Sequence, residues 1–480
     1  MHRRTPIYTA LCKYVREMGL RLHMPGHAGG KGIGDMALQQ LAQLDVTEVP
    51  GLGDLHILEG IMEEARVLLA QAYGAEQSLF LVNGASSGIH TMFMSLPPGQ
   101  RVLVPRNAHR SFYAGMILSG VEPLYIPGRI STEYGWCMSV SSHDIINLLN
   151  AHPDVRSIFL TSPNYLGVSC DLKEICARVR DLNRPISVFV DEAHGGHFPF
   201  HPAYPTPALR AGADAVVNGL HKTLPVLNQG ACLHVQDEDY FYRRILPAWS
   251  LLTTSSPSYP ILASIDLARS LMMLEGEYLL EKALDLSRFY KGKINTIKGL
   301  SVLTEEQLIN WPGAVELDPL KLLINTGGIS LSGLQMASIL RDKYSIQVEM
   351  YGANQVLAMM SMFHQAQDWE LFYRALKDIA WQYPAAKGVR QEIKPVPEPQ
   401  VVVTPREAYF SKNIEVRLSD CLGKISAEMI APYPPGIPCL LPGELISQDI
   451  YEYLLYLKKQ PVSLHGPEDR SLRKIRIIEK

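Results

Sequence analysis

The sequence predicts an α/β protein built around a mostly parallel β-sheet and completed by smaller domains. The first observation is an alternation between about residues 78 and 235, where short apolar runs are separated by helix-like stretches of 10–20 residues. This alternation is typical of βαβ units with helices on both faces of the sheet. The second is length, since 480 residues are too many for one ordinary core. The third is the proline-rich segment 394–400, which has the composition of a linker.

The apolar runs give the expected strands and the helical spacing gives the expected helices. Six buried strands are predicted: Leu79–Val82, Val102–Val104, Pro123–Ile126, Ser157–Thr161, Val188–Val190 and Ala215–Val217. Apolar residues recur near helical spacing between Gly60 and Tyr73, which predicts a helix there. Further helices are expected over roughly 258–298 and near Trp369–Tyr383.

These elements divide the chain into four parts. We expect an N-terminal segment at 1–60, a large domain at 61–300, a small α+β domain at 301–385 and a C-terminal domain at 400–480. The segments Pro384–Gly388 and 394–400 would form the connection before the last domain, because proline and glycine interrupt regular structure.

Composition narrows the possible partners and compartments. The net charge is −3 with no long single-sign run, so no basic face for nucleic acid is expected. No apolar run approaches the roughly 20 residues of a membrane helix, and the N-terminus has no apolar leader-like core. The seven cysteines are odd in number and show no C-x-x-C pair, which favours reduced thiols. We therefore expect a soluble, cytoplasmic protein without a membrane partner.

Two motifs that follow neighbouring strands indicate cofactor chemistry. Asp191-Glu-Ala-His194 comes directly after one strand, where an ionised Asp can pair with a cationic ring nitrogen such as that of pyridoxal 5′-phosphate (PLP). His221-Lys222 follows the next strand, and a desolvated lysine there can form a Schiff base. A helix cap at Asp191 and a solvated Lys222 are the structural alternatives. The pairing of the two motifs favours the cofactor.

A third motif, Asn83-Gly-Ala-Ser-Ser-Gly88, lies between a strand and a helix. Small residues and hydroxyls at a helix N-terminus can bind a phosphate through backbone N–H groups. The same letters fit G-x-S-x-G, the nucleophile elbow of serine hydrolases, with Ser86 as nucleophile. A plain helix cap is a further alternative. A hydrolase would leave Lys222 without a role.

Histidines form two more candidate groups. His109, in Asn107-Ala-His-Arg-Ser111, follows a strand and could stack on a flat ring or simply begin a helix. His194, His197 and His201 have a spacing that could bind metal, but Pro199 and Pro202 would break the helix needed to align them. We therefore predict no metal site.

Taken together and in this order, the motifs resemble the Orn/Lys/Arg decarboxylase family, PLP enzymes of the aspartate-aminotransferase fold (fold type I). The resemblance covers nearly the whole chain, and the length resembles the shorter bacterial form without an N-terminal wing domain. The matching segments are HMPGH at 23–27, DVTE at 45–48, GLGDLH at 51–56, NGASSG at 83–88, NAHRS at 107–111, DEAHGGH at 191–197, HKTLP at 221–225 and PYPPGIPCLLPGE at 432–444.

The resemblance implies a role for each matching residue. Lys222 would form the Schiff base with PLP, Asp191 would hold the pyridine nitrogen, and His109 and Ala193 would flank the ring, near His194. The phosphate would be held by Ala85, Ser86 and Ser87, and His221 would contact the phosphate or the Schiff base. The carboxylates of Glu444, Asp54 and Glu48 are candidates for the substrate's distal cation. Residues 61–300 would bind PLP, and residues 1–60 would contribute to a homodimer, or a larger homo-oligomer, and to its active site.

One departure from the family pattern affects the cofactor. The family usually has a Ser or Thr shortly before the His-Lys pair, where it helps to bind the phosphate. Here Gly219 and Leu220 offer no hydroxyl, so Asn218 or backbone N–H groups would have to replace it. Without a replacement, the cofactor would bind more weakly or the chain would be a regulatory homologue with little activity.

The expected reaction is decarboxylation of arginine, lysine or ornithine to the corresponding amine, with Lys222 or His221 protonating Cα. Another PLP enzyme of the same fold, such as an aminotransferase or lyase, would keep Lys222 and Asp191. The serine hydrolase and the catalytically weak regulatory homologue stay open at this point.

Overall fold

The computed structural model describes residues 2–131, 133–385, 394, 396–398, 400–433, 437–460 and 462–479. The chain divides into two compact units. Unit 1 comprises Met1–Ser95, Thr161–Pro163 and Ser187–Glu281, and unit 2 comprises Leu96–Leu160, Asn164–Ile186 and Lys282–Lys480. Much of the predicted linker, residues 386–393, 395 and 399, and the middle of the last motif, 434–436, lie outside the described residues. No helix in the described ranges is long and apolar enough to cross a membrane.

The main sheet has seven strands in the order β1-β10-β9-β8-β6-β2-β3. β2 pairs in parallel with β3 and β6, and β8 with β9, whereas β10 is antiparallel to both β1 and β9. All six predicted strands are confirmed within two residues at each end. Their bounds are β1 Gln77–Leu81, β2 Arg101–Pro105, β3 Glu122–Ile126, β6 Ser157–Thr161, β8 Ser187–Asp191 and β9 Ala215–Asn218, joined by β10 Ala231–Val235.

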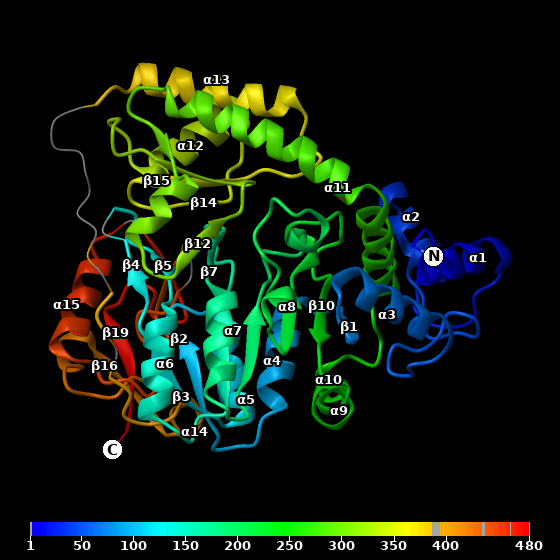
Figure 1. Ribbon diagram of the computed structural model, residues 1–480, viewed down its shortest axis with the longest axis horizontal. Coiled ribbons are helices and arrows are strands. Elements are labelled where there is room, and N and C mark those ends of the chain that lie inside the picture. The colour runs from blue at the N-terminus through cyan, green and yellow to red at the C-terminus, as the bar shows by residue number, and fades with distance from the viewer. Residues whose placement is uncertain are drawn as a thin grey trace. The chain divides into compact units, whose positions relative to one another are not determined.

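Unit 1 surrounds its strands with helices (Figure 1). The helix predicted at Gly60–Tyr73 is present with the same bounds. α4 packs against β1, β8, β9 and β10. A Cβ atom at Gly88 of α4 would lie 2.6 Å from Leu81 and 2.8 Å from Val217, so only glycine permits this close approach. The helices are α1 Pro6–Glu17, α2 Met36–Leu44, α3 Gly60–Tyr73, α4 Gly84–Met94, α8 Ala208–Ala211, α9 Glu238–Tyr240, α10 Leu246–Leu252 and the first part of α11 Tyr259–Asn295.

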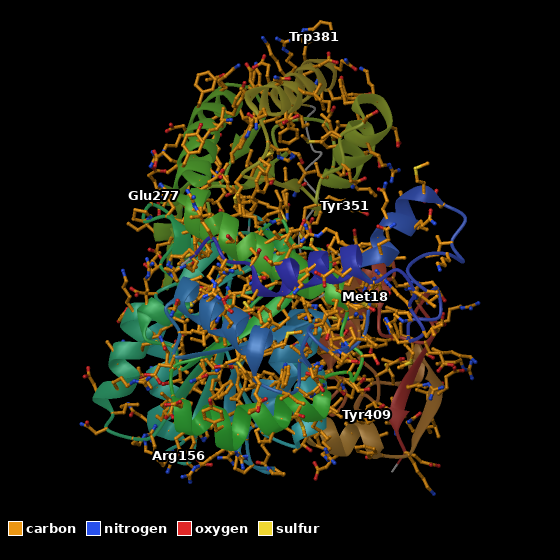
Figure 2. The ribbon with its side chains drawn as sticks, turned by 90° about the vertical axis from the view of Figure 1, so that its right-hand side faces the viewer. Met18, Arg156, Glu277, Tyr351, Trp381 and Tyr409 are labelled. Atoms are coloured by element: carbon orange, nitrogen blue, oxygen red, sulfur yellow. The ribbon has the colours of Figure 1, made fainter. Side chains whose placement is uncertain are left out.

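Unit 2 contains separate apolar cores around two further groups of elements. In one core, α12 and α13 pack with the end of α11 on the sheet β11-β13-β15-β14 (Figure 1). Buried Trp369 faces this core, whereas Trp381 near the end of α13 projects outward and is 81% exposed (Figure 2). The elements are β11 Ser301–Val302, β13 Lys321–Asn325, α12 Gly333–Tyr344, β14 Met350–Tyr351, β15 Gln355–Met359 and α13 Ala366–Gln382.

The other core belongs to the C-terminal residues, where α15 packs beside short antiparallel strand pairs. The elements are α14 Pro405–Phe410, β16 Asn413–Arg417, β17 Ala431–Tyr433, α15 Gln448–Leu457, β18 Ser463–His465 and β19 Lys474–Ile478. The exact boundaries at 301–385 and 400–480 stay a prediction.

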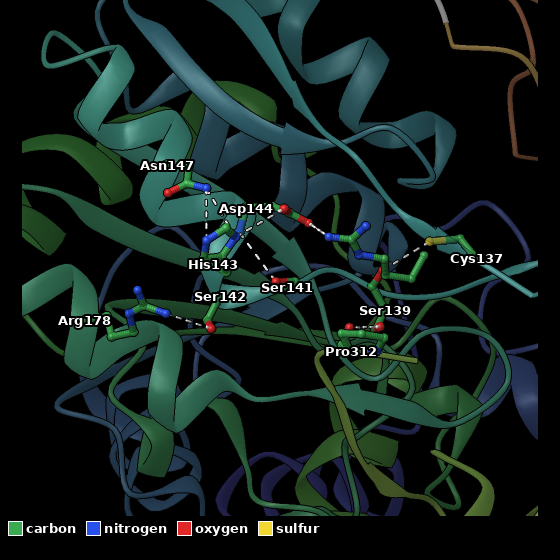
Figure 3. Close-up of polar contacts among 10 residues, drawn as sticks. Cys137, Ser139, Ser141, Ser142, His143, Asp144, Asn147, Arg178 and Pro312 are labelled. Atoms are coloured by element: carbon green, nitrogen blue, oxygen red, sulfur yellow. Dashed lines mark hydrogen bonds and ion pairs between the residues drawn. The ribbon is translucent and has the colours of Figure 1, made fainter. Parts of the chain in front are cut away.

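Polar contacts fasten a small hairpin of unit 2 to its neighbours (Figure 3). Arg129 of β4 forms an ion pair with Asp144 near the start of α6. The hydroxyl of Ser139 in β5 donates a hydrogen bond of 2.8 Å to the Pro312 carbonyl. The remaining elements of unit 2 are β4 Arg129–Ile130, β5 Cys137–Ser139, α5 Arg110–Ser119, α6 Ser142–Ala151, β7 Val168–Cys170, α7 Leu172–Asp181 and β12 Ala314–Leu317.

Candidate active site

The carboxyl ends of β1, β8 and β9 lie at one edge of the sheet. In the strand register, Asp191 is beside Val217, Val217 is beside Leu233, and Leu233 is beside Leu79. Because β10 is antiparallel to both neighbours, β1 and β9 point in the same direction as β8. The polar motifs that follow these strands therefore meet at this edge, where open α/β sheets bind ligands.

Asp191, His194 and Lys222 are brought together there. Asp191 is 5% exposed, and its Oδ1 accepts a hydrogen bond of 3.1 Å from the backbone N–H of Ala193. Lys222 Nζ lies 3.2 Å from His194 Nε2. Burial raises the pKa of Asp191, whereas the charge of Lys222 and the Ala193 N–H oppose that rise. An additional cation beside this carboxylate would favour its ionised form further.

The Asn83–Gly88 motif forms the start of α4. The Asn83 side chain makes no capping hydrogen bond, and Gly84 has a φ of 73°, a conformation that favours glycine. The Gly84 N–H donates to the Gln229 carbonyl over 2.8 Å. The next N–H groups at the start of a helix have no intrahelical acceptor, so they are available to an anion. Ala85 is buried, Ser86 is half-buried, and the Ser87 hydroxyl donates to the Gly84 carbonyl over 2.8 Å.

The segment before Lys222 has no space for the hydroxyl side chain that the family pattern has there. A Cβ atom at Gly219 would lie 2.9 Å from the Ala193 carbonyl oxygen, so a Ser or Thr would require the backbone to move. His221 Nδ1–H donates to the Gly230 carbonyl over 3.0 Å, and burial lowers the pKa of the imidazole, which keeps it neutral near pH 7.

Sequence reasoning also missed two threonines that lie beside the motifs. The Oγ1 atoms of Thr161, at the end of β6, and Thr223, after Lys222, are buried without a hydrogen-bond partner among the described residues. A lone threonine gives no sequence signal, although Thr161 ends a predicted strand and Thr223 adjoins Lys222.

The Asn218 side chain lies on the face of the sheet opposite to α4. Val217 packs on Gly88 of α4, so Asn218, the next residue of β9, projects from the opposite face of the sheet. Its side-chain amide donates to Glu192 Oε2 over 2.9 Å and to the Glu192 carbonyl over 3.1 Å. The amide is therefore directed at Glu192, a residue that sequence reasoning did not single out.

His109 belongs to unit 2, where it caps the N-terminus of α5. Its Nδ1 accepts a hydrogen bond of 3.3 Å from the Ser111 N–H and lies 2.8 Å from the Ser111 hydroxyl. With Nδ1 as acceptor, the ring proton resides on Nε2. These contacts fix the orientation of the imidazole.

Two of the acidic candidates, Glu48 and Asp54, lie near the Tyr259 phenol of unit 1. The phenol donates to the Gly53 carbonyl over 2.5 Å, and burial together with both carboxylates raises its pKa. Asp54 Oδ1 accepts from the His56 N–H over 2.8 Å. Glu48 Oε1 is buried without a hydrogen-bond partner among the described residues, which leaves an acceptor for a cationic group.

The third acidic candidate, Glu444, already has a cation from its own chain. Glu444 is 1% exposed, and its Oε2 accepts hydrogen bonds from Arg106 over 2.9 Å and from the Leu441 N–H over 2.8 Å. Arg106 also donates to the Pro438 carbonyl over 2.8 Å. This ion pair lies within unit 2 and ties the C-terminal residues to the segment that follows β2.

An aromatic pocket of about 510 Å³ also lies within unit 2. Its lining includes Tyr125, Tyr134, Trp136, Tyr351, Tyr453 and Tyr456. Glu398 is its one carboxylate among the described residues, and neither Lys222 nor Asp191 lines it. The pocket is therefore separate from the Lys222 group and poorly suited to a basic amino acid.

Family models match most of the chain. The model described as Orn/Lys/Arg decarboxylase, major domain, matches residues 5–368, and the model described as Orn/Lys/Arg decarboxylase, C-terminal domain, matches residues 388–468. The first match includes Asp191 and Lys222, and the second includes Glu444.

Known relatives and structures agree with these models. An arginine decarboxylase of Bacillus subtilis is 33% identical over 99% of this chain and 98% of its own length. The crystal structure of the Francisella novicida lysine decarboxylase LdcF has a TM-score of 0.84 at 22% identity, over 99% of this chain and 81% of that one. A pyridoxamine-pyruvate aminotransferase from Mesorhizobium loti has a TM-score of 0.55 at 15% identity, over 72% of this chain and 88% of that one. The fold predicted from the sequence is confirmed.

Proposed function

The chain belongs to the Orn/Lys/Arg decarboxylase family and decarboxylates a basic amino acid, and we propose that arginine is its substrate and that Lys222 carries its cofactor. Membership of this family implies PLP. The assignment of Lys222 rests on one observation: its Nζ lies 3.2 Å from His194 Nε2, and its charge acts on the buried Asp191. The family result decides against the alternative in which Ser86 is a hydrolase nucleophile.

The residues of unit 1 fit PLP in charge and hydrogen bonding. The buried Asp191 carboxylate suits a protonated pyridine nitrogen, because a cation there opposes the cost of burying the charge. The uncapped start of α4, with Ala85, Ser86 and Ser87, suits the phosphate. Backbone N–H groups stay the proposed replacement for the hydroxyl that Gly219 lacks, because the Asn218 amide is directed at Glu192. His109 and Ala193 stay proposed for the two faces of the ring.

The proposed chemistry divides between the cofactor and the chain. When bound, PLP supplies an electron sink for the electron pair that carbon dioxide leaves on Cα. Lys222, as an ammonium, delivers the proton to Cα. His221 does not compete for this role, because its pKa is lowered by burial and Nδ1–H is held by the Gly230 carbonyl. Neutral His221 instead holds the segment before Lys222 in place through its hydrogen bond to the Gly230 carbonyl.

Arginine is proposed from a relative and from two carboxylates. The Bacillus subtilis protein, similar over 99% of this chain, is an arginine decarboxylase. Glu48 and Asp54 both lie near Tyr259, and a planar guanidinium can bond a carboxylate in a bidentate manner that a compact ammonium cannot. Glu444 is a less open candidate for the distal cation, because Arg106 bonds its Oε2 and only its Oε1 is without a hydrogen-bond partner among the described residues.

The test is release of carboxyl-labelled carbon dioxide from arginine, lysine and ornithine by the PLP-loaded protein. Arginine is expected to have the highest kcat/KM, by roughly tenfold or more, since one charge-assisted contact is worth 1.5–3 kcal/mol. A preference for lysine or ornithine would refute the substrate proposal while leaving the cofactor assignment intact. Absence of turnover on all three, with the cofactor bound, would favour a regulatory homologue.

We also propose that the protein is a homodimer or a larger homo-oligomer assembled through its N-terminal residues. Eight large apolar side chains between residues 18 and 57 are at least 43% exposed, which is unfavourable in water and typical of a buried interface. They are Met18 (Figure 2), Leu20, Leu22, Met24, Met36, Leu38, Leu41 and Ile57. Light scattering after gel filtration should give at least twice 53.5 kDa, and an active monomer would refute this assembly.

A further inference from the structure

Glu192 is a buried carboxylic acid next to Asp191 on the opposite face of the sheet. It is 2% exposed. Oε1 accepts a hydrogen bond of 2.7 Å from the Ala208 N–H, and Oε2 accepts one of 2.9 Å from the Asn218 side-chain amide. Because side chains alternate along β8 and β9, Glu192 and Asn218 share the face that α4 does not cover.

These contacts join the two segments that carry the proposed cofactor residues. The turn after Glu192 contains Ala193 and His194, and Asn218 lies four residues before Lys222. The Asn218 amide also donates to the Glu192 carbonyl over 3.1 Å, and the Gly195 N–H donates to the same carbonyl over 2.9 Å. Glu192 is thus bonded to both segments at once.

The turn is also tightly packed around Glu192. A Cβ atom at Gly195 would lie 2.6 Å from Glu192 Cγ, so the turn closes directly over this side chain. The Tyr73 phenol also holds this turn, since it donates to the Gly196 carbonyl over 2.8 Å. A close-packed turn moves when its central side chain is removed, and the displacement would change where His194 lies.

We propose that Glu192 is a positioning residue for the cofactor site: through Asn218 and the turn it closes, its carboxyl fixes His194 relative to Lys222. The inference rests on the proposed function, in which Lys222 carries PLP. Glu192 itself projects to the face away from α4, so it acts through its two partners and needs no contact with cofactor or substrate.

The experiment compares four variants with the wild type. Glu192→Ala removes both hydrogen bonds. Glu192→Gln preserves the size and the acceptor for the Ala208 N–H. Asn218→Ala removes the other half of the link and tests it if Glu192→Ala fails to fold. Glu428→Ala is the matched control, because Glu428 is a buried glutamate of the C-terminal residues that accepts two backbone N–H groups, from Glu468 and Arg476.

Three readouts separate positioning from general stability. They are the affinity of the apo-protein for PLP, the pH midpoint of the cofactor's visible band, and Tm. Glu192→Ala and Asn218→Ala should weaken PLP binding roughly tenfold or more, as loss of supporting hydrogen bonds does at ligand sites, and should shift the band midpoint. Glu192→Gln should recover most of the affinity. Glu428→Ala should lower Tm but change neither cofactor readout.

Wild-type affinity and band midpoint in both Glu192→Ala and Asn218→Ala would overturn the inference even if Tm falls. An equal loss of PLP affinity in Glu428→Ala would also overturn it, because the effect would then be one of general stability. A wild-type protein that takes up no PLP would overturn the cofactor assignment, and this inference with it.

Discussion

Unit 1 and unit 2 each bury a carboxylate that the sequence motifs single out, and the two differ in their partners. Asp191 and Glu444 are 5% and 1% exposed, and burial raises the pKa of both. Glu444 is bonded to the Arg106 guanidinium, which is itself held by the Pro438 carbonyl. Asp191 has the nearby charge of Lys222, an amine that can react. A buried carboxylate in a motif can thus either bind a ligand or stabilise the fold. The neighbouring cation indicates which: a bonded arginine for Glu444, and a reactive lysine for Asp191.

The largest expected effect in this comparison of Asp191 with Glu444 is that of replacing Lys222, the cation beside Asp191. Lys222→Ala should abolish the visible band of the PLP-loaded protein and lower kcat by roughly a thousandfold or more, because both cofactor attachment and the proton donor are lost. The measurements are an absorbance scan and labelled carbon dioxide release. Lys222 is only half-buried, so Tm of the apo-protein should change little. An unchanged band would refute the assignment of Lys222.

At the other carboxylate, the expected effect is on stability. Arg106→Met leaves Glu444 buried without its cation and should lower the free energy of unfolding by about 3–5 kcal/mol. Adding Glu444→Gln should recover part of that loss, because the uncompensated charge is removed. Urea unfolding of the two single variants and the double variant measures the coupling. If Glu444→Gln instead leaves stability unchanged and raises KM for arginine sharply, Glu444 binds the substrate. Its assignment to stabilising the fold would then be wrong.

A smaller effect is expected where the substrate's distal cation is proposed to bind. Glu48→Gln and Asp54→Asn should each reduce kcat/KM for arginine by roughly 10–100-fold, since each removes a charged hydrogen-bond acceptor worth 1.5–3 kcal/mol. The loss should lie mainly in KM, with the cofactor band unaffected. The control is Asp266→Asn, which alters a buried carboxylate that is paired with Arg269 and bonded to the N–H groups of Ile7 and Tyr8; it should lower Tm without a specific rise in KM for arginine. A fall in kcat with constant KM would point to a role in the chemical step.

The strands and the motifs at their ends are predictable from the sequence because they are local features. An apolar run followed by Asp191 or His221 indicates both a buried strand and a polar residue at its carboxyl end, where ligands bind in such sheets. β10 is absent from the predicted strands because His234 interrupts its apolar run. In the fold His234 is neutral, its pKa lowered to about 3 by burial, and its Nδ1 lies 2.7 Å from the Ser78 hydroxyl.

The partners of the motif residues are not predictable in this way. Arg106 and Glu444 are 338 residues apart, and neither residue's neighbours indicate the pairing. Glu192 lies inside a recognised motif, yet its bonds to Ala208 and Asn218 depend on the register of β8 and β9. Similarly, the lack of space at Gly219 follows from the position of the Ala193 carbonyl, which only the folded turn sets.

The last expected effect is a pH dependence that separates Glu192 from its neighbour. Burial raises the pKa of Glu192 to about 8 from its usual 4.5, with a further rise from the charge of Asp191, while the Asn218 amide and the Ala208 N–H oppose it. Tyr73 of α3 and Cys232 of β10 are further titratable groups near it, and burial raises the pKa of both, so they stay uncharged.

The folded protein therefore binds a proton at Glu192 that the unfolded chain releases between about pH 4.5 and 8. The contribution of Glu192 to stability falls as pH rises through this window, by up to about 1.4 kcal/mol per pH unit. Glu192→Gln removes the titration, so urea unfolding of the apo-protein should show a shallower decline from pH 6 to pH 8 than in the wild type. Parallel declines in the two proteins would mean that Glu192 is ionised in the fold, held by its two donors as an anion. Asp191 would then have a second negative charge beside it, and the site would depend still more on the cation that Lys222 and the cofactor supply.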